Sequence, residues 1–133
     1  MEANKTKEYR ILIVDDSDFT RSNISAMLDE PKYNIIGEAM NANEAINILK
    51  DRKAHLAIID VVMPDVSGIE LANYINDNFQ DTAVIMISSL GQESIVIDSI
   101  SAGASDYIQK PFSKEDLLTS VDKVLENIAN NED

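Results

Sequence analysis

Short apolar runs alternate with amphipathic stretches along this chain of 133 residues. The longer runs are continuously aliphatic, without the polar alternation of a half-exposed strand. They therefore predict strands covered on both faces, as in a parallel sheet. The predicted strands are residues 11–14, 35–36, 56–59 and 83–87, with a short fifth at 107–109.

The stretches between these runs carry apolar residues at helical spacing, which predicts five amphipathic helices. Ser113 followed by Asp116 is typical of a capping box at the start of the last one. The predicted stripes are Ile24, Met27 and Leu28, then Ala42, Ala45, Ile46 and Leu49, then Ile69, Ala72 and Ile75, then residues 94–102, and finally Leu117, Val121, Val124 and Ile128. Five strand–helix alternations predict a doubly wound α/β fold, in which right-handed crossovers bring the carboxyl ends of all strands to one edge.

Length and charge narrow the class of protein. The length suits one domain, for which we expect a loose extension at residues 1–9, a folded unit at 10–126 and a polar tail at 127–133. The formal net charge of −13 argues against partners such as nucleic acid or an anionic membrane. The first ten residues have no apolar signal region, and no apolar run approaches the ~18 residues of a membrane span, so a cytoplasmic protein is expected.

Several kinds of chemistry are excluded by composition. The chain has no cysteine, which rules out disulfides and thiolate chemistry, and the four glycines are too far apart for a phosphate-cradling loop. The single histidine, His55, precedes the third predicted strand and should lie ~16 Å from that strand's carboxyl end. A surface or helix-end histidine is therefore the preferred interpretation of His55.

Polar and charged residues follow four of the predicted strands. Asp15 and Asp16 follow the first, Asp60 the third, Ser88 the fourth and Lys110 the fifth. Alone, an Asp in such a place is usually a turn former or helix cap, and a Lys-Pro pair is commonly a turn. Together, three converging carboxylates repel one another unless a cation or protons intervene. A hard divalent ion held by oxygen ligands is the natural solution, which points to Mg²⁺, Mn²⁺ or Ca²⁺. Mg²⁺, which typically takes one or two carboxylates, is preferred and Mn²⁺ could substitute, and the ammonium and hydroxyl groups complete a site for a phosphoryl group.

These segments resemble a known family, the receiver domain of two-component response regulators. The resembling segments are residues 13–17, residues 59–68, Ser88 and residues 107–112, and the match extends from about residue 10 to 126. Residues 15–21 and 90–93 are similar to segments of single-domain CheY-like chemotaxis proteins. The resemblance implies a flavodoxin-like, five-stranded parallel sheet of order 2-1-3-4-5 flanked by five helices.

The resemblance also implies a role for each metal-site residue. Asp60 would be the nucleophile that accepts a phosphoryl group as an aspartyl phosphate. Asp16 and Asp60 would bind Mg²⁺ directly, Asp15 mainly through a water, and Val62 through its backbone carbonyl oxygen.

Three further residues take roles by the same resemblance. Lys110 would pair with a phosphoryl oxygen, and the Lys110–Pro111 peptide is expected to be cis. Ser88 would donate its hydroxyl hydrogen to the phosphoryl group, and Tyr107 would reorient when Ser88 moves.

The chain departs from the commonest family pattern in two places. Ser88 stands where Thr is usual, and Val61 and Val62 follow Asp60 where members often carry polar residues. The resemblance further implies that Val62 and Leu90 flank the path of the hydrolytic water, to which neither side chain can offer a hydrogen bond. The protein is therefore expected to lose its phosphoryl group slowly, which makes a phosphatase or back-transfer to a kinase more necessary.

Three functions compete. A phosphorylation switch served by a histidine kinase is preferred, and self-catalysed phosphoryl acceptance and slow autodephosphorylation would be its only enzymatic properties. A haloacid-dehalogenase-like phosphohydrolase would need a second Asp where Val62 stands, and a pseudo-receiver scaffold would not need to retain the whole acidic cluster.

The output is expected to be noncovalent, because few residues follow Glu126. The expected partner is a flagellar motor switch protein or another output protein, bound by a monomer, and a phosphorelay shuttle is the alternative. The fourth helix carries Ile95, Val96, Ile97 and Ile100, more apolar residues than one core-facing stripe needs. It is expected to form a docking face with the fifth strand and the fifth helix.

Overall fold

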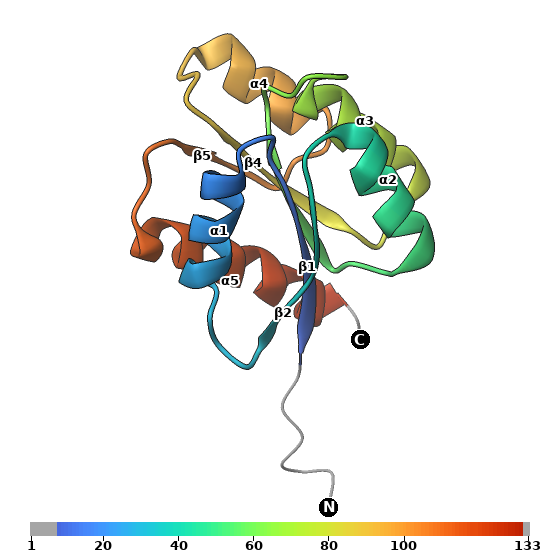
Figure 1. The fold of residues 1–133 in the computed structure, drawn as a ribbon, viewed down its shortest axis with the longest axis vertical. Coiled ribbons are helices and arrows are strands. Elements are labelled where there is room, and N and C mark those ends of the chain that lie inside the picture. Colours follow the sequence, from blue (N-terminus) through green and yellow to red (C-terminus); the bar gives the residue numbers. More distant parts are fainter. Residues whose placement is uncertain (1–7, 132–133) are drawn as a thin grey trace, which may run out of the picture.

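Five parallel strands form one sheet with helices on both faces, as Figure 1 shows for this computed structural model, which describes residues 8–131. The strand order is β2-β1-β3-β4-β5, which confirms the expected topology. The elements in chain order are β1 (Tyr9–Val14), α1 (Asp18–Met27), β2 (Tyr33–Ala39), α2 (Ala42–Asp51), β3 (Leu56–Asp60), α3 (Gly68–Asn78), β4 (Ala83–Ser88), α4 (Glu93–Ser101), β5 (Asp106–Gln109) and α5 (Lys114–Asn131).

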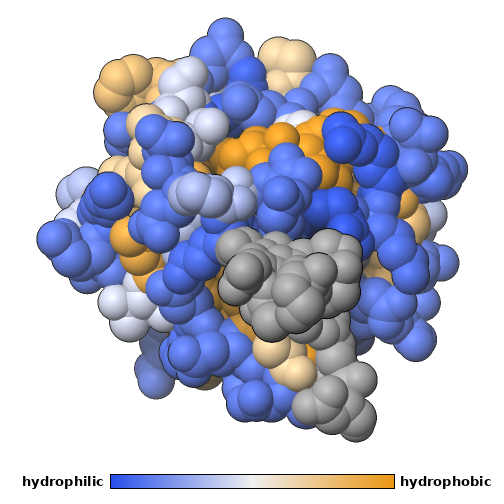
Figure 2. Space-filling model, turned by 90° about the horizontal axis from the view of Figure 1, so that it is seen from below, coloured by the Kyte–Doolittle hydropathy of each residue, from blue (hydrophilic) through white to orange (hydrophobic). Residues whose placement is uncertain are grey.

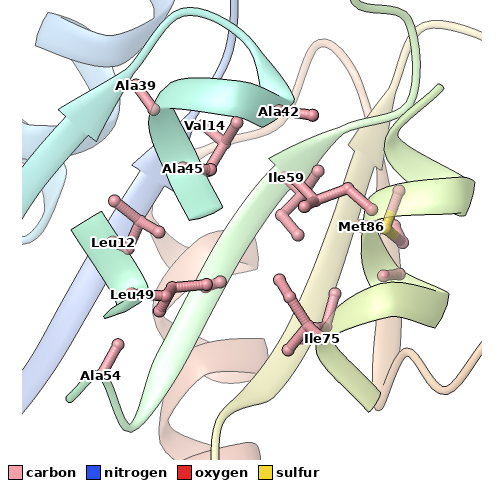
Figure 3. Packing of buried hydrophobic residues seen from close by; sticks show 14 of the residues in the cluster. Leu12, Val14, Ala39, Ala42, Ala45, Leu49, Ala54, Ile59, Ile75 and Met86 are labelled. Atoms are coloured by element: carbon pink, nitrogen blue, oxygen red, sulfur yellow. The ribbon is translucent and has the colours of Figure 1, made fainter. Parts of the chain in front are cut away.

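The sheet divides the apolar core into two layers because successive side chains of a strand point to opposite faces. On one face, Leu12 and Val14 of β1 and Ile59 of β3 pack against α2 and α3, as Figure 3 shows. On the other face, Ile11 and Ile13 of β1 pack in a cluster with residues of α1 and α5. Burial on both faces explains why the central strands are continuously aliphatic.

The edge strand β2 is longer than its sequence pattern predicts. Only residues 35–36 form an uninterrupted apolar pair, yet the strand runs from Tyr33 to Ala39. Its exposed Asn34 and Glu38 interrupt the apolar pattern, which is what a strand at the sheet edge allows. The pairing with β1 shifts by one residue between Ile11 and Leu12.

The chain ends differ in part from expectation. The last helix begins after a reciprocal cap in which the Ser113 N–H donates to Asp116 and the Asp116 N–H donates to Ser113 Oγ. It continues to Asn131, so residues 127–131, expected in a polar tail, are helical. Residues 1–7 of the predicted extension and residues 132–133 of the tail lie outside the described residues.

The surface seen in Figure 2, at the end of the molecule where β1 begins, is largely hydrophilic with smaller hydrophobic areas. Within residues 8–131, no helix combines the length and apolar character that a membrane crossing requires.

Candidate functional site

Three carboxylates meet at the carboxyl ends of β1 and β3. These strands are paired neighbours, with Val14 opposite Ile59, so Asp15 and Asp16 emerge beside Asp60. One carboxylate oxygen from each of the three residues lies within 4.8 Å of the other two. Asp15 and Asp60 are buried and Asp16 is exposed, so the cluster opens to solvent on one side.

Asp15 is held from several directions. Its Oδ1 accepts from the Ser17 N–H at 2.9 Å, and its Oδ2 accepts from the Lys110 ammonium at 3.0 Å. Its own N–H donates to the Ala39 carbonyl at 3.0 Å. Because its carboxylate is buried, these contacts offset the cost of removing the charge from water.

Lys110 brings a positive charge from β5 to the cluster. Its Nζ lies 3.0 Å from Asp15 Oδ2 and 3.6 Å from Asp60 Oδ2. The Lys110–Pro111 peptide bond is cis, as the family resemblance implied. One ammonium facing three carboxylates leaves the site with excess negative charge.

The environment of Asp60 favours its protonated form. Burial, followed by the negative charge of Asp15, raises the pKa of the Asp60 carboxyl from 3.8 to about 6, although the Lys110 charge and the Val62 N–H oppose the change. A divalent cation would relieve the same repulsion.

The donor set fits Mg²⁺ rather than a softer metal. The clustered side chains offer only carboxylate oxygens, which are the ligands that hard cations prefer. The close approach of the three carboxylates and the raised pKa of Asp60 both indicate a site that would be stabilised by a bound cation.

The loop after Asp60 passes close to the strand it leaves. An added Cβ at Gly68 would lie 2.1 Å from the Asp60 backbone oxygen, so only glycine fits there. The Gly68 N–H donates to the Val61 carbonyl at 2.7 Å and closes the loop. Val62 lies within this loop with 55% of its surface exposed, at the rim of the cluster.

Ser88 and Tyr107 are connected through the backbone of one residue. The Leu90 N–H donates to the buried Ser88 Oγ at 2.9 Å, and the Tyr107 hydroxyl donates to the Leu90 carbonyl. The two side chains are therefore linked by hydrogen bonds to the N–H and the carbonyl of a single residue, Leu90.

Two residues near the site were missed by sequence reasoning. Asp65 accepts from the N–H groups of Ala42 and Asn43 at 3.1 Å each, and so ties the loop after Asp60 to the start of α2. Arg21 donates to the Asp15 carbonyl oxygen. Neither residue directly follows a strand, and hydrogen bonds to a distant backbone leave no spacing signal in the sequence.

His55 lies away from the cluster, as predicted. It precedes β3, its N–H donates to the Arg10 carbonyl, and its Nδ1 accepts from the Arg10 N–H at 2.9 Å. These bonds place it at the amino-terminal edge of the sheet.

Comparisons with known proteins agree with this geometry. The family model described as the response regulator receiver domain matches residues 11–122. The chain is 38% identical over 117 residues to the chemotaxis protein CheY of Bacillus subtilis, covering 88% of this chain and 98% of that protein. It is 35% identical to the CheY of Thermotoga maritima, with 86% and 96% covered.

Solved structures show the same fold. The crystal structure of a CheX–CheY–BeF3–Mg²⁺ complex from Borrelia burgdorferi contains a chain with a TM-score of 0.84 and 32% identity, with 90% of both chains covered. A CheY-like receiver domain protein from Methanospirillum hungatei matches with a TM-score of 0.87 and 26% identity, covering 94% of this chain and 99% of that one.

Proposed function

This chain belongs to the response regulator receiver family, and from that premise we propose that it is a phosphorylation switch with Asp60 as the acceptor. The observation that carries the proposal is the position of the Lys110 ammonium, 3.0 Å from Asp15 and 3.6 Å from Asp60 at one edge of the sheet. An ammonium beside clustered carboxylates can pair with a phosphoryl oxygen once one carboxylate has become an acyl phosphate.

In the proposed reaction, a carboxylate oxygen of Asp60 attacks the phosphorus of a phosphohistidine on a partner kinase. A P–O bond forms and the P–N bond breaks, with its electron pair remaining on the imidazole nitrogen. Lys110 pairs with a phosphoryl oxygen during the transfer. Asp15, Asp16, Asp60 and the Val62 carbonyl would hold Mg²⁺, whose charge would stabilise the phosphoryl oxygens when the ion is bound.

The switch itself would use Ser88 and Tyr107. Ser88 Oγ now accepts from the Leu90 N–H, so its hydroxyl hydrogen remains to be donated to a phosphoryl oxygen. We propose that this donation draws Ser88 toward Asp60, that the segment at Leu90 follows, and that Tyr107, bonded to the Leu90 carbonyl, then reorients.

The proposed output surface is the face of α4, β5 and α5. Ile97 and Ile100 of α4 are 55% and 48% exposed, and Ser99 is the only buried residue of that helix. The chain covers 98% of the Bacillus subtilis CheY and 96% of the Thermotoga maritima CheY. This similarity supports chemotaxis control through a flagellar motor switch protein. A phosphorelay shuttle is the alternative output.

The covalent step is tested by incubating the protein with acetyl phosphate and Mg²⁺ and measuring its intact mass. One added phosphoryl group is expected in the wild type and none in Asp60→Asn or in the presence of a chelator. Asp77→Asn is the matched control, because Asp77 is an exposed aspartate on α3. An unmodified wild type would favour a pseudo-receiver.

A further inference from the structure

Arg21 is a largely buried cation that joins three segments beside the acidic cluster. Only 11% of its side chain is exposed. Its Nη1 donates to the backbone carbonyl of Asp15, its Nε donates to Glu38 Oε1 of β2 at 3.2 Å, and its Nη2 donates to Asp18 of α1. One guanidinium therefore bonds the end of β1, the neighbouring edge strand and its own helix.

The contact with the Asp15 carbonyl bears directly on the cluster. That carbonyl belongs to the peptide unit linking Asp15 to Asp16, and a peptide unit is planar. A hydrogen bond that fixes this carbonyl therefore fixes the orientation of the whole peptide plane, and with it the Cα positions of Asp15 and Asp16. The side chain of Asp15 is fixed independently by Ser17 and Lys110, whereas within residues 8–131 no side-chain hydrogen bond or ion pair holds the exposed Asp16.

We propose that Arg21 is a positioning residue of the metal site, holding the Asp15–Asp16 peptide so that both carboxylates face one cation. The inference rests on the proposed function insofar as Asp15 and Asp16 bind Mg²⁺. Outer partners that orient metal ligands typically contribute 10–100-fold to metal affinity. The planar fork of an arginine suits this task, because it can bond several fixed acceptors at once.

Charge and geometry make opposite predictions for the loss of Arg21. Removing a cation beside an anionic site, and freeing Asp18 and Glu38 from their ion pairs, makes the site more negative and by itself tightens Mg²⁺ binding. Loss of the fixed Asp15 carbonyl weakens binding. The direction of the change in Mg²⁺ affinity therefore distinguishes a positioning role from a merely electrostatic one.

The test is isothermal titration of metal-free protein with Mg²⁺ for Arg21→Gln, Arg21→Lys and Arg52→Gln. Arg52 is the matched control, because its Nη1 also donates to a backbone carbonyl, that of Ile36 on β2, at 2.7 Å. We expect the Kd for Mg²⁺ to rise about tenfold in both Arg21 variants. In Arg52→Gln the Kd stays at the wild-type value, although thermal unfolding registers the lost contact.

Arg21→Lys keeps the positive charge and removes only the forked set of guanidinium donors. If Arg21→Gln does not fold, Arg21→Lys is sufficient for the test. An unchanged Kd in Arg21→Lys, or a tighter one in Arg21→Gln, would overturn the positioning role while leaving the proposed function intact. A wild type that binds no Mg²⁺ would contradict the proposed function, and this inference with it.

Discussion

At the scale of single residues, the acidic cluster combines burial with like-charge repulsion. Asp60 is 6% exposed, faces the charge of Asp15, and receives only partial compensation from Lys110 at 3.6 Å. Because the pKa of Asp60 differs between the folded and the unfolded chain, it affects the pH dependence of stability as well as the reactivity of the carboxylate.

The first prediction concerns pH and the stability of the metal-free protein. A carboxyl whose pKa rises from 3.8 to about 6 on folding binds its proton more tightly in the folded state, so the fold loses stability as pH increases through that interval. At neutral pH, Asp60→Asn should raise the free energy of unfolding by on the order of 3 kcal/mol, at ~1.4 kcal/mol per pH unit. Urea denaturation at pH 4 and pH 7 measures this. A variant no more stable than the wild type at pH 7 would refute the prediction.

The same raised pKa predicts how the rate of phosphorylation depends on pH. The nucleophile is the Asp60 carboxylate, so protonation of this group removes it. At Mg²⁺ concentrations below saturation, the rate of phosphorylation by acetyl phosphate should therefore fall as the pH is lowered through about 6.

The second prediction concerns the lifetime of the phosphorylated state. Val62 is 55% exposed at the rim of the cluster, and both backbone groups of Leu90 are engaged by Ser88 and Tyr107. Neither side chain can orient a water, and poor positioning of a reactant can slow a reaction about 100-fold. The double variant Val62→Asn, Leu90→Glu should therefore lose its phosphoryl group faster after donor removal. Equal decay in the double variant and the wild type would show that another feature sets the lifetime.

At the scale of elements, the residues directly at strand ends could be predicted from the sequence, whereas side-chain contacts between different elements could not. The central strands were predictable because burial on both faces leaves a continuous aliphatic run, and their carboxyl ends place Asp15, Asp16 and Asp60 together. The length of the edge strand β2 was underestimated because its solvent-exposed positions carry polar residues, which interrupt the apolar pattern. The contacts of Arg21 and Asp65 depend on tertiary placement, which spacing along the chain does not encode.

The third prediction tests one of these cross-element contacts. Asp65 accepts from two N–H groups in the first turn of α2 and from the Val66 N–H at 2.8 Å. Asn41 is the N-cap residue of α2, and Asp65 satisfies two further N–H groups of the same turn. Loss of a side-chain cap typically costs about 1 kcal/mol, so Asp65→Ala should destabilise the fold by about that amount. Denaturation with urea measures it. Asp81→Ala is the control, because Asp81 and its partner Lys53 are 84% and 77% exposed and such pairs contribute little. Equal stability of Asp65→Ala and Asp81→Ala would contradict a capping role.

At the scale of the whole molecule, the proposed acceptor and the proposed output surface occupy different parts of one sheet. The acidic cluster lies after the inner strands β1 and β3, whereas α4 packs beside the edge strand β5. The proposed connection between them begins at Ser88, the last residue of β4, and continues through hydrogen bonds to Leu90 and then to Tyr107.

The fourth prediction separates output from phosphorylation. Ile97→Glu and Ile100→Glu place charge on exposed positions, so they should leave folding and phosphoryl uptake unchanged while abolishing control of flagellar reversal in cells that depend on the variant. Ile75→Glu, at a fully buried position of α3, should unfold the protein. Normal reversal control by both α4 variants would place the output surface elsewhere.

The central claim is that Asp60, among three clustered aspartates, carries the phosphoryl group. An acyl phosphate is reduced by borohydride, which converts its aspartate into homoserine, so peptide mass spectrometry of reduced protein identifies the acceptor. After treatment with acetyl phosphate and Mg²⁺, we predict homoserine at position 60 and intact aspartate at positions 15 and 16. Homoserine at either of those positions, or none at position 60, would contradict the account.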